Sequence, residues 1–253
     1  MLPLEAITAR LLADLAALPE SGMRLALFSR TLASLQPEEG SGIIGIILKK
    51  GPEDAGAAIV RAILVDNDGV LKSLGQAQYD SIYLASLRLG LVRVSRFFTD
   101  FEAHREGVSG YEEEEFIKTA HLTLGERRGL AKSHLIRHLE KLLSDPDPEV
   151  VENLLNNPRI TEKEVLKIAS KRPNSPVVLK RVALHNKWSK RYDVLKAISR
   201  NPYTPTRVSI ALVEFMLSQD LSAISEDTTI HPEVRQAAKE VLAEKGGKGQ
   251  GKG

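Results

Sequence analysis

An internal repeat constrains the fold of this chain more than any other sequence feature. Residues 164–176, EVLKIASKRPNSP, align without gaps on residues 193–205, DVLKAISRNPYTP, at an offset of 29. The Val, Leu, Lys, Ser and both Pro positions are identical, and Asp replaces Glu. This offset fits two helices of about ten residues with tight turns, so the repeated unit is a helix pair of about 30 residues. Because one such pair cannot bury its apolar face alone, the pattern predicts an α-solenoid of stacked antiparallel helix pairs.

Regularly spaced prolines support the prediction of short helices separated by tight turns over residues 145–234. Pro–Asx–Thr turns recur between short apolar runs, as in NPRITEKEV at 157–165 and NPYTPTRV at 201–208. Proline ends the helix before it, because it disfavours helical backbone at the preceding residue. We expect Thr161, Ser175 and Thr204 to cap the helices that follow them, and Thr161 with Glu164 to form a capping box.

The segment DPDPEVVENLLNNPRITEKEVLKIAS resembles the leucine-rich repeat variant family, whose architecture is related to HEAT and armadillo repeats. Those repeats open with Asp-Pro-Asp-Pro-Glu-Val and continue to an Asn-Pro-x-Thr-Pro element. The resemblance covers about residues 126–243 and implies an α-solenoid that offers a surface to partners. The repeats here are longer and less uniform. With no cysteine, the chain cannot carry the cysteine-ligated cluster that some members of the family have.

The remainder of the chain predicts an all-α protein in two parts. Apolar residues recur at helical spacing over 2–18, 23–35, 52–65, 76–89 and 91–103. We expect a break over 37–42, a strand or a buried helical turn over 43–48, and a turn over 66–69. The division predicted is an N-terminal helical domain (1–103), a linker (104–110), the helical-repeat domain (111–245) and a disordered Gly/Lys tail (246–253). The acidic run 112–115 should open a helix, and residues 232–243 should form a final helix that caps the stack.

Charge is concentrated in the repeat region. Residues 1–117 carry net charge −6, residues 118–210 carry +10 and residues 211–253 carry −2. No acidic residue occurs between Glu164 and Asp193. We take this stretch as a candidate partner-binding surface, made of Lys167, Lys171, Arg172, Lys180, Arg181, Lys187, Trp188, Lys190 and Arg191. Residues four apart, as in Lys167/Lys171 and Lys187/Arg191, should share a helix face.

Trp188, the only tryptophan, has two interpretations. It could stack on nucleic-acid bases at the basic surface. The favoured interpretation is a core residue that fills an irregular turn between repeats.

Several short sequence patterns resemble known functional motifs, but none of them predicts a catalytic, cofactor or metal site. Residues 40–45, GSGIIG, fit G-x-G-x-x-G, but neither a strand precedes them nor a helix start follows, so we expect a flexible loop. Residues 66–69, DNDG, lack the carboxylates of a calcium loop at its first and last positions. His134 and His138 fall four apart on one predicted helix but have no evident third ligand. We therefore expect a protein that is not an enzyme and uses no cofactor.

The leading hypothesis is a non-catalytic interaction or scaffold protein whose basic helical-repeat surface binds an acidic or phosphorylated protein partner. The alternative is a nucleic-acid-binding HEAT-like repeat protein, and a weaker third hypothesis is an enzyme with its site between the two halves. The absence of cysteine fits a reducing cytoplasm. The N-terminal segment is expected to form an amphipathic helix instead of a signal peptide, and no apolar run reaches the length of a membrane span.

Overall fold

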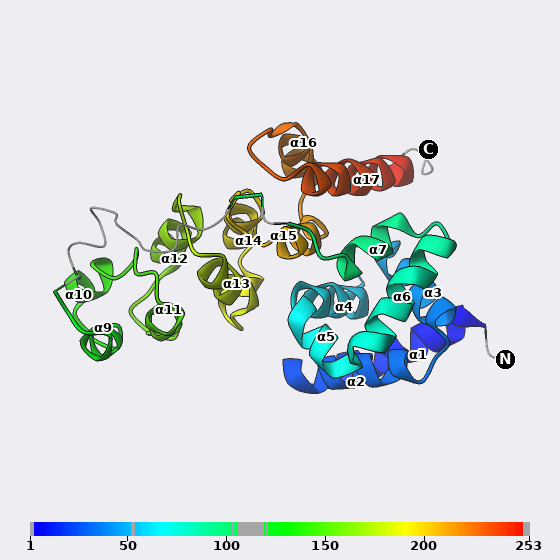
Figure 1. Ribbon diagram of the computed structural model, residues 1–253, viewed down its shortest axis with the longest axis horizontal. Helices are drawn as coiled ribbons and strands as arrows, with labels where there is room; N and C mark the ends of the chain where they lie inside the picture. Colours follow the sequence, from blue (N-terminus) through cyan, green and yellow to red (C-terminus); the bar gives the residue numbers. More distant parts are fainter. Residues whose placement is uncertain (1–2, 52–53, 103, 106–118, 120, 250–253) are drawn as a thin grey trace. The chain divides into compact units, whose positions relative to one another are not determined.

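The computed structural model describes residues 3–51, 54–102, 104–105, 119 and 121–249. All regular secondary structure in these ranges is helical, which confirms the all-α class (Figure 1). No helix in the described ranges is both long and apolar enough to cross a membrane.

The first seven helices lie in the N-terminal part of the chain. They are α1 (Leu4–Ala17), α2 (Ser21–Ala33), α3 (Pro37–Leu48), α4 (Ala55–Val65), α5 (Asn67–Leu74), α6 (Gln76–Arg88) and α7 (Val92–Phe98). The helices of the repeat region are α9 (Leu124–Leu130), α10 (Ile136–Glu140), α11 (Pro148–Leu155), α12 (Glu162–Ser170), α13 (Pro176–Leu184), the 3₁₀ helix η1 (Trp188–Lys190), α14 (Tyr192–Ser199) and α15 (Thr206–Val213). The chain ends in α16 (Ser218–Glu226) and α17 (Pro232–Gly249).

The chain forms two compact units that are not continuous in sequence. Unit 1 comprises residues 1–101, 213–225 and 236–253, and unit 2 comprises residues 102–212 and 226–235. This division differs from the one predicted, because two C-terminal segments join the N-terminal helices instead of the repeats. Only the first residues of α17 belong to unit 2, so this helix does not simply cap the repeat stack as expected.

Unit 1 is a bundle in which α3 packs on α1 and α6, and α6 packs on α7. Its core is aliphatic and aromatic, and includes the fully buried side chains of Leu15, Phe28, Ile44 and Ile82. Helix α4 packs on α1 at Gly56, where a Cβ atom would lie 2.8 Å from the Cβ of Leu12. A glycine is therefore needed for these two helices to approach each other so closely.

A buried ion cluster attaches the C-terminal segments to this bundle. Arg93 of α7 donates two hydrogen bonds to Glu214, whose side chain is 3% exposed, and another to Glu244 of α17. Arg61 of α4 lies 3.8 Å from the same Glu214 carboxylate. Burial alone would lower the pKa of Arg93, but its bonds to Glu214 and Glu244 raise it above the ordinary value. The arginine is thus held charged, and residues of α4, α7 and the C-terminal segments are joined in one network.

The break expected at 37–42 and the flexible loop expected at 40–45 are both wrong. Helix α3 begins at Pro37, and the side chains of Gln36 and Glu39 complete a capping box at its start. The small residues lie in the helix packing interface, since Gly40, Ser41 and Gly45 are all buried. Ser41 also donates a hydrogen bond of 3.0 Å to the carbonyl of Ile82 in α6.

Two further expectations differ from the structure, and two others are not covered by the described residues. The predicted turn at 66–69 is the start of α5, where Asp66 caps the helix by accepting from the backbone N–H of Gly69. The predicted tail at 246–253 is helical up to Gly249, because α17 extends that far. The acidic run 112–115 and most of the predicted linker 104–110 lie outside the described residues.

Unit 2 contains the repeated helices. Helix α12 packs on α14, α11 packs on α13, and α9 packs on α11, so alternate helices are neighbours (Figure 1). The Thr161–Glu164 capping box at the start of α12 is confirmed. Ser175 occupies the predicted N-cap position of α13 without a side-chain bond to the backbone. Thr204 lies two residues before the start of α15, and its hydroxyl donates back to the carbonyl of Ile198.

Side-chain hydrogen bonds from three residues of unit 2 reach the end of a helix in the preceding repeat. Asn157 donates to the carbonyls of Ala131 and Ser133, at 2.9 Å each. Asn201 donates to the carbonyls of Ala169 and Lys171, at 2.8 and 2.9 Å. Trp188 does the same with its indole N–H, which lies 2.9 Å from the carbonyl of Leu155. Each bond satisfies a carbonyl that the end of a helix leaves without an intrahelical partner.

Candidate functional site: a basic groove between α12 and α14

Helix α12 forms one wall of the groove. Its buried face is set by Val165, Ile168 and Ala169. The spacing of an α-helix then places Leu166 and Ser170 on another face, where both line the groove. Lys167 is exposed on the same helix.

Helix α14 forms the opposite wall. Val194, Leu195 and Ile198 are buried, so the intervening positions face outward. Asp193, Lys196 and Ala197 line the groove, and Arg200 follows directly at the C-terminal end of the helix. Because α12 and α14 are successive members of the repeat, the groove lies between equivalent helices of neighbouring repeats.

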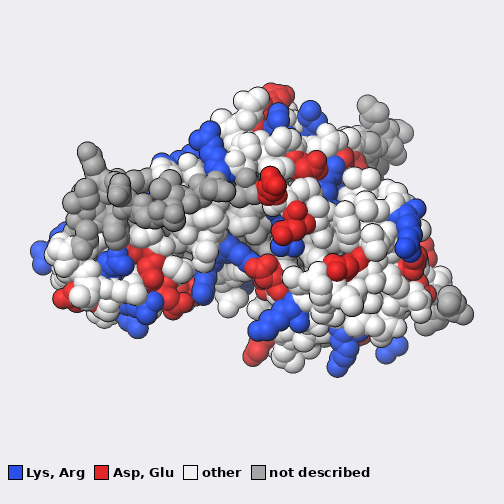
Figure 2. Space-filling view, viewed as in Figure 1, with Lys and Arg blue, Asp and Glu red and all other residues white. Residues whose placement is uncertain are grey.

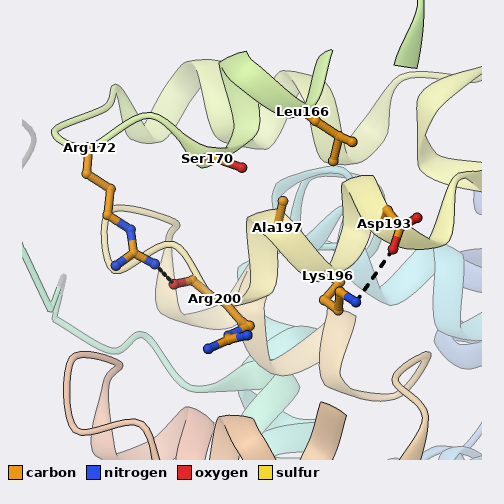
Figure 3. A pocket seen from close by; sticks show the side chains of 7 residues that line it. All are labelled: Leu166, Ser170, Arg172, Asp193, Lys196, Ala197 and Arg200. Carbon is orange, nitrogen blue, oxygen red and sulfur yellow. Dashed lines mark hydrogen bonds and ion pairs between the residues drawn. The ribbon is translucent and has the colours of Figure 1, made fainter. Parts of the chain in front are cut away.

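The groove is open to solvent and has a volume of about 410 Å³. Figure 3 shows its lining, with Arg172 from the turn after α12 reaching towards the C-terminal end of α14. Its walls combine three basic side chains with a small apolar surface. The lining residues are Leu166, Ser170, Arg172, Asp193, Lys196, Ala197 and Arg200.

The three cations of the groove each contact groups of the protein itself. Arg172 donates one hydrogen bond of 2.5 Å to the backbone carbonyl of Arg200 (Figure 3). Lys196 lies 3.5 Å from the exposed carboxylate of Asp193 and 5.6 Å from the ring centroid of Tyr192. Arg200 lies 3.7 Å from the carboxylate of Asp227. Because such a long and partly exposed ion pair is weak, the two arginines retain donors that an anionic ligand could accept from.

Asp227 comes from the turn between α16 and α17, in the segment that belongs to unit 2. Its carboxylate accepts hydrogen bonds from the backbone N–H and the hydroxyl of Thr229, at 3.0 and 2.6 Å. Burial alone would raise the pKa of Asp227. The bonds from Thr229 and the positive charges of Arg200 and Arg172 lower it below its usual value. The carboxylate therefore stays ionised beside the arginines.

Of the nine residues predicted as a binding surface, only Arg172 lines the groove. Lys167 is exposed on α12, the helix that forms one wall. Arg181 faces Glu149 and Glu152 of α11, at 3.4 and 3.8 Å. Figure 2 likewise shows basic and acidic side chains interspersed over the face in view.

The remaining predicted residues lie in or beside the turns. Lys171 donates to the carbonyl of Ser144, and Arg191 lies 3.8 Å from Glu162. Lys180 is half-buried on α13, and Lys190 is exposed in η1.

The expected face-sharing pairs are wrong, because the helices end too early. Helix α12 ends at Ser170, so Lys167 and Lys171 do not belong to one helical face. Lys187 precedes the 3₁₀ helix η1, and Arg191 follows it.

Trp188 is 1% exposed and packs among the repeats, with the ammonium of Lys187 4.1 Å from its ring centroid. Its indole N–H is used within the protein. The residue therefore agrees with the favoured interpretation as a core residue, and it offers no ring face for a base to stack on.

Lys196 and Arg200 lie outside the predicted binding surface, because that surface was defined by the stretch without acidic residues, which stops at Asp193. The repeat itself contained the signal. An offset of 29 from Lys167 and Lys171 leads to Lys196 and Arg200, so the same helix positions are basic in both repeats.

The histidine pair that was weighed as metal ligands is not on one helix. His134 precedes α10, and His138 lies within it, with its ring nitrogen 3.2 Å from the hydroxyl of Ser133. In the described part of the chain, no three His, Asp or Glu side chains are grouped as metal ligands.

No protein-family model matches this chain. No curated protein and no solved structure matches it either. Its function therefore has to be argued from the chemistry of the site.

Proposed function

We propose that unit 2 is a short α-solenoid of the HEAT-like, leucine-rich repeat variant type. In this proposal it acts as a non-catalytic interaction module, and the groove between α12 and α14 binds an acidic or phosphorylated segment of a protein partner. The observation that carries the proposal is the convergence of Arg172, Lys196 and Arg200, from two successive repeats, on one open groove.

The packing of unit 2 supports the solenoid. Helices two apart in sequence are neighbours, as expected when helix pairs stack. The hydrogen bonds from Asn157, Trp188 and Asn201 join consecutive repeats through buried polar contacts. A stack joined in this way holds its surface side chains at fixed spacings, which reduces the entropy lost on binding.

The lining of the groove supports an acidic peptide as its occupant. Arg172 and Arg200 can each donate several N–H bonds to carboxylate or phosphate oxygens. Leu166 and Ala197 provide an apolar surface, against which the aliphatic parts of a peptide can pack. The exposed Lys167 on α12 adds a further positive charge on one wall helix.

Two observations favour a protein segment over nucleic acid. The only tryptophan is buried, so aromatic stacking on bases has no support from it. Arg181 and Arg191, which would extend a basic track beyond the groove, face carboxylates of their own chain. A nucleic-acid backbone presents a continuous row of charges and is best matched by a continuous basic stripe.

The test is fluorescence anisotropy with a labelled peptide of alternating glutamate and serine, and with labelled single- and double-stranded DNA. The variant Lys196→Gln/Arg200→Gln removes two groove cations. Lys132→Gln/Arg137→Gln removes one exposed lysine and one exposed arginine from elsewhere in unit 2 and serves as the matched control.

We expect the wild-type protein to bind the peptide. Loss of even one charge-assisted contact should weaken binding about tenfold, so the groove variant should lose at least that much and the control much less. Equal binding by the groove variant and wild type would overturn the proposal. Displacement of the peptide by DNA, with DNA binding more tightly, would favour the nucleic-acid alternative.

A further inference from the structure

Arg200 of the groove already faces a carboxylate of its own chain that does not itself line the groove. Asp227 lies 3.7 Å from Arg200, and its side chain is 17% exposed. The two hydrogen bonds from Thr229 fix the carboxylate in this position. The arginine end of the groove therefore lies beside a carboxylate that the fold itself supplies.

We infer that this arginine end of the groove binds the phosphoryl group of a phosphorylated protein segment in preference to a carboxylate, and that the negative charge of Asp227 limits this preference. The inference rests on the proposed function, because it specifies which acidic group the same groove selects.

The side chains around the arginine end favour an anion with several acceptor oxygens. Arg172, Lys196 and Arg200 contribute three positive charges, and Asp193 and Asp227 contribute two negative ones. A carboxylate ligand has one negative charge and two oxygens. A phosphoryl group carries a charge of about −1.5 to −2 at neutral pH and three acceptor oxygens. The arginines therefore attract it more strongly and it can accept from both of them, but Asp227 also repels it more strongly than it repels a carboxylate.

The geometry leaves donors for such a ligand. The contact between Arg200 and Asp227 is 3.7 Å, longer than a hydrogen bond. Arg172 is exposed and uses Nη2 for the carbonyl of Arg200. Figure 3 shows both arginines at the end of the groove away from Asp193, one after each wall helix. Two neighbouring guanidinium groups match the several oxygens of one phosphoryl group better than the two oxygens of a carboxylate.

Asp227 opposes the binding of anions at the arginine end. Its negative charge repels a phosphoryl group more strongly than a carboxylate, because the repulsion is proportional to the charge of the ligand. Loss of this charge should therefore improve the binding of both peptides, and that of the phosphopeptide more. The substitution Asp227→Asn suits this test, because an asparagine Oδ1 can still accept from Thr229.

The experiment compares three labelled peptides that are identical except at one central position, which is phosphoserine, glutamate or serine. Each is titrated with the full-length wild-type protein, with Asp227→Asn, and with Glu140→Gln as a control that removes an exposed carboxylate of α10 outside the groove. Thermal melts followed by circular dichroism establish that the variants fold.

We expect wild-type protein to bind the phosphoserine peptide about tenfold more tightly than the glutamate peptide. In Asp227→Asn the affinity for the phosphoserine peptide should rise more than that for the glutamate peptide, so the ratio of the two affinities widens. Glu140→Gln should leave the ratio as in wild type. Equal binding of both peptides by wild type would overturn the inference and leave the proposed function standing. An unchanged or smaller ratio in a folded Asp227→Asn variant would also overturn it. If no peptide binds, the proposed function itself is wrong.

Discussion

Asn201 offers the sharpest test of how the repeats are joined. Its side chain is 1% exposed. Its amide group donates to the carbonyls of Ala169 and Lys171, and its Oδ1 accepts from the backbone N–H of Tyr203. The substitution Asn201→Asp keeps the shape and the acceptor. It replaces the donating amide group by a carboxylate oxygen that faces two carbonyl oxygens at about hydrogen-bond distance.

The expected loss of stability follows from these contacts. Each buried acceptor left without a partner costs about 1–3 kcal/mol, so two of them cost about 2–6 kcal/mol. Repulsion between the carboxylate and the carbonyls adds to this at neutral pH. Protonation of the aspartate restores a single donor, so the loss should be smaller at low pH than at neutral pH.

Trp188 makes the assay specific for unit 2. It is the only tryptophan, it is buried, and it belongs to this unit, so urea unfolding followed by its fluorescence reports on the repeats. The matched control is Asn186→Asp, which makes the same chemical change at an exposed position and should change stability by no more than about 0.5 kcal/mol. If Asn201→Asp unfolds at the same urea concentration as Asn186→Asp at neutral pH, the side-chain bonds between repeats do not stabilise the stack, and the reasoning fails.

Three more changes test other parts of the fold. Trp188→Phe removes the indole donor from the carbonyl of Leu155 and should cost at least about 1–3 kcal/mol in urea melts followed by circular dichroism; an unchanged midpoint would contradict this role. Glu214→Ala leaves the charge of Arg93 without its buried partner and should destabilise the protein by about 3–5 kcal/mol in the same assay, whereas a loss below about 1 kcal/mol would show that the ion cluster matters little. Burial raises the pKa of Glu240, but arginine contacts outweigh it and lower the pKa below 4.5. Its stabilisation is therefore present above that pH and lost as pH falls through the lowered folded-state value, so Glu240→Gln should be less stable than wild type at neutral pH and nearly equal in acid. A difference independent of pH would refute this assignment.

The sequence could predict the elements whose determinants are local. The capping box of Thr161 and Glu164 lies within four residues and forms as expected. The offset of 29 predicts that α12 and α14 are equivalent, and their buried faces follow from the apolar spacing of each. The same offset relates Lys167 of α12 to Lys196 of α14, so the basic position on one wall helix predicts the basic position on the other.

Helix α3 shows how a misleading local pattern can be overruled. Glycines in a helix interior cost stability relative to alanine, which favoured a loop over residues 40–45. The packing of these small residues beside α6, with Ser41 bonded to the carbonyl of Ile82, compensates for that cost. Pro37 followed by two glutamates was the local sign of a helix start.

The grouping of residues 213–225 and 236–253 with the N-terminal helices depends on pairs of residues that no local pattern reveals. Arg93 and Glu214 are 121 residues apart, and nothing around either residue distinguishes it from a surface charge. Their pairing becomes necessary only after folding has buried both, because an isolated buried charge would be too costly. The position of Asp227 has the same origin, since a turn residue acquires its role only when the fold places it beside Arg200. The basic residues of the groove walls can therefore be predicted from the repeat. The proximity of Asp227 to Arg200 cannot, because it arises only when the chain folds.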